Sequence, residues 1–352
     1  YKRQGIINAS WGGTPVEAWV SEKGLQNFPE YVHQKALYED TELVSRITET
    51  ERLHQQAWNK VLYKSDAGLH GVTPWYAEDY DDSDWEKVDM FSDNWAIRNG
   101  RPLNGVHWFR KDFFVPEDWS GKEAVLRLGC IVDADSVFVN GHFVGTVSYQ
   151  YPPRIYKVPS KLLKKGKNQL TVRLFSYGGR PSFVKEKPYK LICDGKEVNL
   201  EGGWKHKIGT VMPPSPSSTA FHYTPVGLYN GMIYPLRHYT FKGVVWYQGE
   251  SNVGRWSEYS SLLSALIADW RTLFKDENLP FYIIELADFL APDDPGRAAW
   301  AELRKQQAKT ARENAHVTLI KNSDTGEWND IHPLDKKTAA TRLVEAVIQN
   351  EK

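Results

Sequence analysis

The last third of the chain alternates short apolar runs with longer segments that have a helical pattern. The runs Val244–Trp246, Phe281–Ile284 and Val317–Ile320 have the length and composition of buried strands. The segments after them repeat apolar residues every three to four positions, as helices with one buried face do. Strands that alternate with helices predict a parallel sheet covered on both faces. The expected helices are residues 256–274, 298–314 and 336–348.

The N-terminal part predicts further elements of the same α/β kind. Residues 5–10 begin with an apolar run and are expected to form a buried strand. Residues 29–63 have a helical pattern. The positions expected to be buried in this helical region are Leu37, Leu43, Ile47, Leu53, Trp58 and Leu62.

The middle of the chain has a different pattern. Between about Gly68 and Asn199 the apolar segments are short, alternate with polar residues, and are bounded by turn residues. Residues 136–145 predict a hairpin that turns at Asn140-Gly141, because both central residues of such a turn need a positive φ. Regular short strands of this kind predict a β-sandwich, which would contain both cysteines of the chain. Two other expected strands are residues 124–128 and 169–174.

These patterns predict an α/β domain that is interrupted by an all-β insert. A chain of 352 residues is long enough for two domains. The change of pattern places the first α/β segment at residues 1–67, the insert at 68–212 and the second α/β segment at 213–352. A Pro- and Ser-rich stretch, Pro213–Ser218, marks the second junction.

Composition argues against several classes of protein. Lys plus Arg and Asp plus Glu both number 44, so the formal net charge is zero and gives no support for a nucleic-acid or anionic-membrane partner. No apolar run is long enough to span a bilayer. No Cys/His cluster has zinc-ligand spacing, and no nucleotide-binding glycine pattern occurs, so neither a metal nor another cofactor is expected. Cys130 and Cys193 could pair, but two thiols do not decide a redox compartment.

Three polar segments stand where an α/β domain places its ligands, outside the carboxyl ends of strands. Trp246–Asn252 reads Trp-Tyr-Gln-Gly-Glu-Ser-Asn and follows an expected strand. Ser10–Thr14 follows the first apolar run, and Asp330–Pro333 precedes the last helix. Together the segments resemble the sialate O-acetylesterase family of SGNH-type hydrolases. The resemblance covers residues 5–20 and 215–350 and implies an SGNH-type parallel sheet flanked by helices.

The insert has a resemblance of its own. Residues 85–88, 107–113 and 137–141 are similar to the jelly-roll sugar-binding domain of family 2 glycoside hydrolases. In those enzymes the module is mostly scaffolding, so we expect a structural role for the insert rather than a glycan-binding site. The 14 Trp and 18 Tyr residues likewise fit core packing better than sugar stacking, residue by residue.

The esterase resemblance implies a general base and a group that orients it. His332 is the expected base, since an imidazole can accept and return a proton near neutral pH. Asp330 is the expected orienting acid. Many SGNH hydrolases place this acid three residues before the histidine, which here is Asn329. The histidine could instead be held by an amide, a backbone carbonyl, or another acid such as Asp324 or Glu327.

The resemblance also implies donors for an oxyanion. Gly12 and Gly13 permit close approach of the backbone, so their N–H groups can point at a developing charge. Gln248 and Asn252 are the side-chain candidates; we expect one to contact the substrate and the other to be structural. Glu250 is expected to hold its loop as a buried acid, without a role in proton transfer.

The nucleophile has no match in this sequence. The family carries a Gly-Gln-Ser-Asn type motif upstream of the Trp-Gly-Gly segment, and this chain starts just before that segment. Neither Ser10 nor Ser251 matches the nucleophile position. The nucleophilic serine is therefore expected upstream of residue 1.

The function implied is a carbohydrate O-acetylesterase that acts on acetylated sialic acid or an acetylated plant polysaccharide such as xylan, in the periplasm or outside the cell. A non-catalytic carbohydrate-binding protein is the alternative. A glycosidase would need a pair of catalytic carboxylates on strand ends, and no such pair can be identified. The sequence leaves the sugar and the oligomeric state open.

Overall fold

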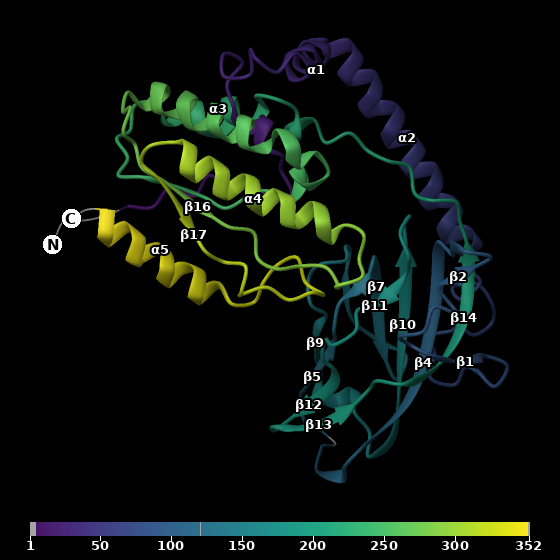
Figure 1. Cartoon of the computed structure of the whole chain (residues 1–352). Helices are drawn as coiled ribbons and strands as arrows, with labels where there is room; N and C mark the ends of the chain where they lie inside the picture. Colours follow the sequence, from purple (N-terminus) through teal and green to yellow (C-terminus); the bar gives the residue numbers. More distant parts are fainter. Residues whose placement is uncertain (1–4, 120, 351–352) are drawn as a thin grey trace. The chain divides into compact units, whose positions relative to one another are not determined.

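The computed structural model describes residues 5–119 and 121–350 (Figure 1). The chain divides into two compact units. Residues up to Thr48 and from Ser218 onward form the α/β unit, and Glu49–Ser217 form the β unit. The first division falls inside one helix, whereas the sequence pattern places it after residue 67. The three-segment division at 67/68 and 212/213 stays a prediction.

The sheet of the α/β unit is parallel. Its strands are β15 (Val244–Trp246), β16 (Phe281–Ile284) and β17 (Val317–Ile320), in that order across the sheet. The helices that follow them are α3 (Trp256–Phe274), α4 (Arg297–Glu313) and α5 (Lys336–Asn350). The alternation read from the sequence is therefore confirmed as a mixed α/β architecture.

The helices cover both faces of this sheet (Figure 1). Phe281 and Ile283 point to the face covered by α3 and α4 and share a core cluster with Leu266 and Leu303. The residues between and after them, Tyr282 and Ile284, pack against α5. This alternation is the one expected for a strand that is buried on both faces.

The prediction of a buried strand at residues 5–10 is wrong. The structure has no strand there, and Ile6 is 96% exposed. An apolar run becomes a strand only when a neighbour pairs with its backbone N–H and C=O groups. Residues 5–10 pair with no described strand, including β15, so they do not join the sheet.

The helical region contains two helices, α1 (Pro29–Glu39) and α2 (Thr41–Ser65). Asp40 separates them, and its carboxylate accepts the backbone N–H groups of Glu42 and Leu43, both at 3.0 Å, as an N-cap does. Of the six positions expected to be buried, only Trp58 and Leu62 are. The period predicts an apolar stripe, but in α2 the structure buries this stripe only at Trp58 and Leu62. Leu37 and Leu53 are exposed, and Leu43 and Ile47 are partly exposed.

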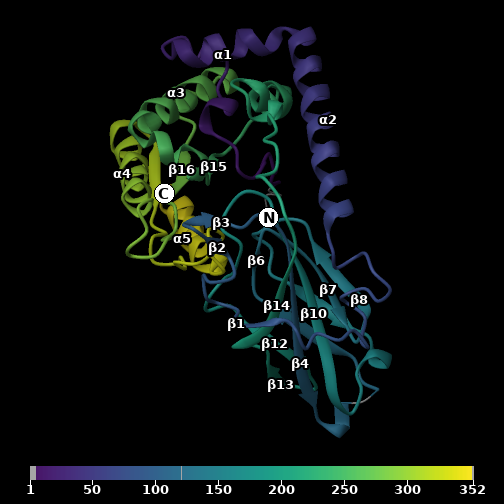
Figure 2. The same cartoon turned by 90° about the vertical axis from the view of Figure 1, so that its right-hand side faces the viewer.

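The β unit consists of antiparallel sheets (Figures 1 and 2). Its largest sheet has the order β1 (Glu86–Asp89), β14 (Gly203–Val211), β4 (Gly105–Val115), β10 (Gly166–Ser176), β7 (Ala134–Val139), β8 (His142–Val147). A second sheet has the order β13 (Lys196–Asn199), β12 (Tyr189–Cys193), β5 (Ala124–Leu128), β9 (Ile155–Val158). Two-residue strands complete the unit: β2 (Ile97–Arg98), β3 (Arg101–Pro102), β6 (Ile131–Val132), β11 (Ser182–Phe183).

The two larger sheets of the β unit enclose one core. Phe109 and Val172 of the six-stranded sheet share a cluster with Leu126 and Leu191 of the four-stranded sheet, which is the arrangement of a sandwich. The hairpin prediction is confirmed, since Asn140 and Gly141 have φ values of 49° and 79° between β7 and β8. Both cysteines lie in this unit. Cys193 is a buried free thiol, and the Cys130 thiol donates to the carbonyl oxygen of Tyr151 at 3.4 Å.

Within the described residues, no helix has the length and apolar character that crossing a bilayer requires.

Candidate active site

Two of the three polar segments meet at the carboxyl end of β15. The side-chain amide of Gln248 donates to the carbonyl oxygen of Thr14 at 2.9 Å. The carbonyl oxygen of the Asn252 side chain accepts the backbone N–H of Val16, also at 2.9 Å. These bonds join residues more than 230 positions apart in sequence. This edge of the sheet is therefore lined by segments that lie far apart in sequence.

Both side-chain amides are committed to this junction. Asn252 is fully buried; its oxygen accepts from Gln248 as well as Val16, and its NH2 donates to Glu17 at 3.0 Å. Gln248 is 8% exposed, and its oxygen accepts the hydroxyl of Tyr259 at 3.0 Å. In this arrangement the two amides hold the Thr14–Glu17 segment rather than face solvent.

Gly12 and Gly13 lie at the surface beside these amides. The carbonyl oxygen of Gly12 accepts the hydroxyl of Tyr223 at 2.8 Å, and that of Gly13 accepts the hydroxyl of Ser251 at 2.6 Å. Gly13 has a φ of 74°, a left-handed conformation that favours glycine. These hydrogen bonds hold the carbonyl groups of both glycines in place. The rest of the glycine backbone is exposed and can contact a ligand.

A buried carboxylate that sequence analysis missed supports the same segment. Glu17 is 4% exposed and accepts from Asn252 and, at 2.5 Å, from the guanidinium of Arg255. It lies in the short turn Val16–Trp19, whose residues are all buried. In the sequence, Glu17 appears only as a single acidic residue within an apolar stretch. This pattern is too common to identify a functional site.

His332 lies in the loop before α5, and its side chain is 62% exposed. One oxygen of Asp330 accepts the backbone N–H of His332 at 2.9 Å. The same oxygen is 3.9 Å from the ring nitrogen Nδ1, which is within ion-pair range but longer than a hydrogen bond. Asp330 thus lies on the Nδ1 side of the ring, and its nearer contact is to the backbone.

Glu250 is a second carboxylate near this histidine. Burial raises the pKa of Glu250, whereas backbone hydrogen bonds and the positive charges of His332 and Lys336 lower it in part. The ammonium group of Lys336 lies 5.5 Å from the ring centre of Tyr247, at the end of β15. His332 therefore shares an electrostatic environment with the loop that contains Gln248 and Asn252, and all three segments belong to one region of the α/β unit.

Asp324, another acid considered as a partner of His332, is engaged elsewhere. Its two oxygens accept from the guanidinium of Arg342, both at 2.6 Å. This bidentate pair lowers the pKa of Asp324 to about 2. Among the residues that the structure describes, no cluster of three or more His, Cys, Asp or Glu side chains is placed to hold a metal ion.

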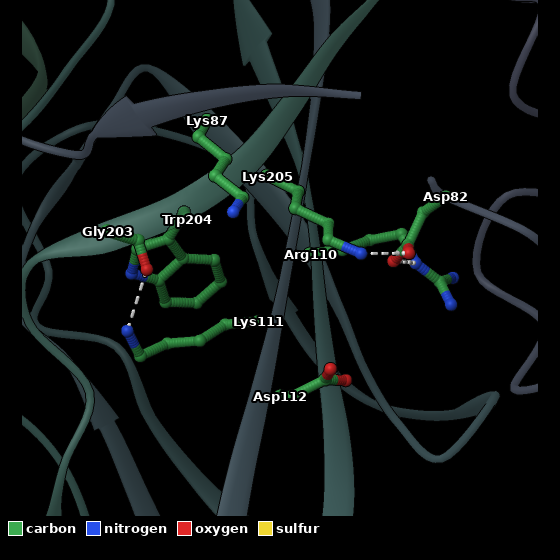
Figure 3. Close-up of a pocket in the computed structure, with 8 residues that line it drawn as sticks. All are labelled: Asp82, Lys87, Arg110, Lys111, Asp112, Gly203, Trp204 and Lys205. Atoms are coloured by element: carbon green, nitrogen blue, oxygen red, sulfur yellow. Dashed lines mark hydrogen bonds and ion pairs between the residues drawn. The ribbon is translucent and has the colours of Figure 1, made fainter. Parts of the chain in front are cut away.

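The β unit contains a pocket of about 240 Å³ that is separate from these segments (Figure 3). Its lining has four basic and two acidic side chains. Asp82 pairs with both Arg110 and Lys205, and Asp112 pairs with Lys167 at 3.0 Å. None of the predicted site residues lines it. Its lining is Asp82, Lys87, Arg110, Lys111, Asp112, Gly203, Trp204 and Lys205. We therefore place the candidate active site at the edge of the parallel sheet.

Two family models match the chain. The model described as "Carbohydrate esterase, sialic acid-specific acetylesterase" matches residues 204–349. The model described as "Glycosyl hydrolases family 2, sugar binding domain" matches residues 45–204. The first match contains Gln248, Asn252 and His332, and the second contains most of the β unit.

Curated relatives carry the name sialate O-acetylesterase. The mouse protein is 33% identical over 33% of this chain and 24% of its own length. The rat protein is 32% identical over 45% of this chain and 30% of its own length. The human protein is 33% identical over 33% of this chain and 25% of its own length. The chain thus spans less than a third of the length of these relatives.

Solved structures share weaker similarity. A carbohydrate acetylesterase from Xanthomonas citri is 20% identical over 68% of this chain and 70% of that chain, with a TM-score of 0.34. A β-glucuronidase from Ruminococcus gnavus is 19% identical over 34% of this chain and 23% of that chain, with a TM-score of 0.23. Scores this low add nothing to the assignment, which the family models carry. Residues 204–349 are thus similar to the carbohydrate esterase family of sialic acid-specific acetylesterases, and residues 45–204 to the sugar-binding domain of family 2 glycosyl hydrolases.

Proposed function

We propose that this chain is part of a carbohydrate O-acetylesterase that performs serine-hydrolase chemistry on an SGNH-type α/β unit. The observation that carries the proposal is the junction of Gln248 and Asn252 with the Thr14–Glu17 segment, in the same region as His332. A base beside fixed, exposed backbone N–H groups is what acyl transfer requires. The acetylesterase family match over residues 204–349 supports the same chemistry.

The proposed roles follow from exposure and contacts. His332 removes the proton of a serine hydroxyl while that oxygen attacks the acetyl carbonyl. The N–H groups of Gly12 and Gly13 receive the oxyanion, while Gln248 and Asn252 position the segment behind them. Collapse of the intermediate releases the sugar hydroxyl, which takes the proton from His332. Water then attacks the acetyl-serine, with His332 again as base. The acyl C–O bond breaks, the serine oxygen takes the proton back from His332, and acetic acid leaves.

The partner of the imidazole is one of two carboxylates. One oxygen of Asp330 is 3.9 Å from Nδ1. Glu250 is partly buried, which raises its pKa, and the charge of His332 partly offsets this rise. We favour Asp330 because it lies on the Nδ1 side of the ring, which leaves Nε2 for the serine.

The nucleophilic serine is proposed to come from a segment upstream of residue 1. The hydroxyl of Ser251 donates to Gly13, so its proton does not face a base. The exposed apolar residues Ile6 and Val245 lie near the site segments in sequence and would gain a partner from an added strand. The proposed substrate is an acetylated sugar, either sialic acid or a plant polysaccharide such as xylan. Such a substrate fits a periplasmic or secreted protein.

The proposal is tested with acetyl esters and three proteins: residues 1–352, a longer protein that includes the upstream segment, and the longer protein with His332→Ala. We expect turnover by the longer protein, a loss of about 10²–10⁴-fold in His332→Ala, and little or no activity of residues 1–352. The exposed His238 provides a matched control, since His238→Ala should leave the rate unchanged.

Two results would contradict parts of the proposal. Robust turnover by residues 1–352 would mean that the nucleophile lies within this chain, and Ser10→Ala and Ser251→Ala would then identify it. A longer protein that hydrolyses no acetyl ester but binds acetylated sugars would favour the non-catalytic carbohydrate-binding alternative.

A further inference from the structure

Trp11 presents a large aromatic surface beside the candidate oxyanion segment. Its side chain is 51% exposed, although indole rings are usually largely buried. It immediately precedes Gly12, whose N–H group belongs to the proposed oxyanion site. An exposed aromatic ring next to a reactive centre is a natural contact for the non-reacting part of a substrate.

The position of the indole is fixed by its surroundings. The ring of His222 lies 4.9 Å from it, centre to centre, at an angle of 39°. The neighbour of His222, Tyr223, donates its hydroxyl to the carbonyl oxygen of Gly12. The carbonyl oxygen of Trp11 itself accepts the hydroxyl of Thr14 at 2.9 Å. The indole and the Gly12 peptide are therefore held in one constellation, as a preorganised binding site requires.

Tyr247 is the other exposed aromatic residue of the site segments, and its ring is already engaged. The ammonium of Lys336 lies over the ring, and the hydroxyl accepts from the amide of Asn322 at 3.2 Å. Trp11 is more exposed than Tyr247, at 51% against 37%, and has His222 as its ring neighbour. Trp11 is thus better placed than Tyr247 to stack against an uncharged, apolar surface of a ligand.

We propose that the indole of Trp11, backed by His222, stacks against the C–H face of the pyranose ring that carries the acetyl ester. The inference rests on the proposed function, because it assumes that the ligand is an acetylated sugar. It makes Trp11 a specificity-determining residue: the ring holds the sugar while Gly12 and Gly13 face the ester. An acetyl ester without a sugar ring would gain nothing from it.

The first test compares two kinds of ester with the longer protein. Trp11→Ala is expected to raise KM for an acetylated methyl xylopyranoside about threefold to tenfold, with kcat nearly unchanged, while kcat/KM for ethyl acetate stays the same. Trp11→Phe should restore most of the loss. Tyr239→Ala is the matched control, since Tyr239 is also exposed, at 59%, and contacts one ring, that of Phe241. Equal effects of Trp11→Ala on both esters would overturn the proposal.

The second test measures binding and does not depend on hydrolysis. Residues 1–352 are titrated with acetylated xylo-oligosaccharide while the indole N–H signals are followed by NMR, with Trp11→Phe used to assign Trp11. A shift of the Trp11 signal, and weaker binding by Trp11→Ala, are expected. An unmoved signal with unchanged affinity would refute the inference, as would burial of Trp11 by the upstream segment of the longer protein. Failure of the proposed function would instead appear as absent turnover of ethyl acetate by the wild-type longer protein.

Discussion

Asn252 joins groups from two distant parts of the chain: the backbone of Val16, the carboxylate of Glu17 and the amide of Gln248. All of these groups are buried. A buried polar group that loses its partner retains the cost of leaving water, about 1–3 kcal/mol for each group. Asn252 therefore contributes to stability as well as to the shape of the proposed oxyanion site.

We predict that Asn252→Ala lowers the free energy of unfolding of the α/β unit by about 2–4 kcal/mol, because Val16 and Glu17 lose their buried partner. Urea unfolding of residues 1–352 measures this change. Ser251→Ala is the control, since it removes one hydrogen bond from an exposed residue and should cost less than about 1 kcal/mol. A loss of the same small size in Asn252→Ala would contradict the structural role of this amide.

Two buried histidines give the β unit a pH-dependent stability. His107 and His206 are stacked, with Nδ1 of the first 3.0 Å from Nε2 of the second. Burial lowers the pKa of His107 to about 4 and, together with the charge of His107, that of His206 to about 3. Both rings are therefore neutral in the folded protein above those values, whereas in the unfolded chain they protonate below about pH 6.5.

The unfolded state thus binds more protons as the pH falls below about 6.5, and the stability of the β unit should fall with it. At pH 5 the expected loss is about 2 kcal/mol for each histidine relative to pH 7 or above. Urea unfolding at pH 7 and pH 5 measures the loss, and His206→Gln should reduce the pH dependence by about half. His142→Gln, at an exposed position of β8, should retain the full dependence. A pH dependence unaltered by His206→Gln would show that carboxylates dominate.

At the scale of elements, helix α2 shows what periodicity can and cannot predict. The spacing of Leu53, Trp58 and Leu62 predicts helix correctly, but only the last two are buried. Periodicity reports that one face is apolar, whereas burial depends on a neighbouring element that the local sequence does not specify. The same reason explains why residues 5–10 have the composition of a strand and no strand structure.

This difference predicts unequal effects of the same substitution within α2. Leu62 is 2% exposed and Leu53 is 50% exposed. Leu62→Ala should lower the free energy of unfolding by about 2–5 kcal/mol because it leaves a cavity, while Leu53→Ala should change it by less than about 0.5 kcal/mol. Thermal or urea unfolding of both variants provides the measurement. Similar losses in the two variants would mean that Leu53 has a partner in solution.

The candidate site was predictable in part. The resemblance of three segments to the acetylesterase family predicted Gly12, Gln248 and His332 as site residues. The supporting groups Glu17 and Arg255 carry no such pattern, since their role arises from contacts between segments that lie far apart in sequence. The hydrogen bonds of Gln248 and Asn252 to the Thr14–Glu17 segment likewise follow from the fold and not from the local sequence.

At the scale of the whole molecule, each unit has its own hydrophobic core. One cluster centres on Phe109 and Leu126 in the β unit, and another on Phe281 and Leu266 in the α/β unit. We expect residues 49–217 to fold as an isolated fragment, because its sandwich core lies within those residues. Cooperative unfolding of the fragment, followed by circular dichroism and tryptophan fluorescence, measures this. A fragment that remains unfolded would show that its core depends on the remainder of the chain.

The discontinuous α/β unit has a consequence for the order of events during protein synthesis. Residues up to Thr48 leave the ribosome before the strands that follow Ser218. They cannot complete their unit until the last of these strands, which ends at Ile320, has followed, roughly 15–55 s later at about 5–20 residues per second. Within the β unit, Trp58 donates to Pro213 at 2.9 Å, so folding of this unit brings its two ends together. The folded insert then lowers the entropy cost of bringing the two segments of the α/β unit together. During synthesis, folding of the α/β unit should therefore follow folding of the sandwich that interrupts it.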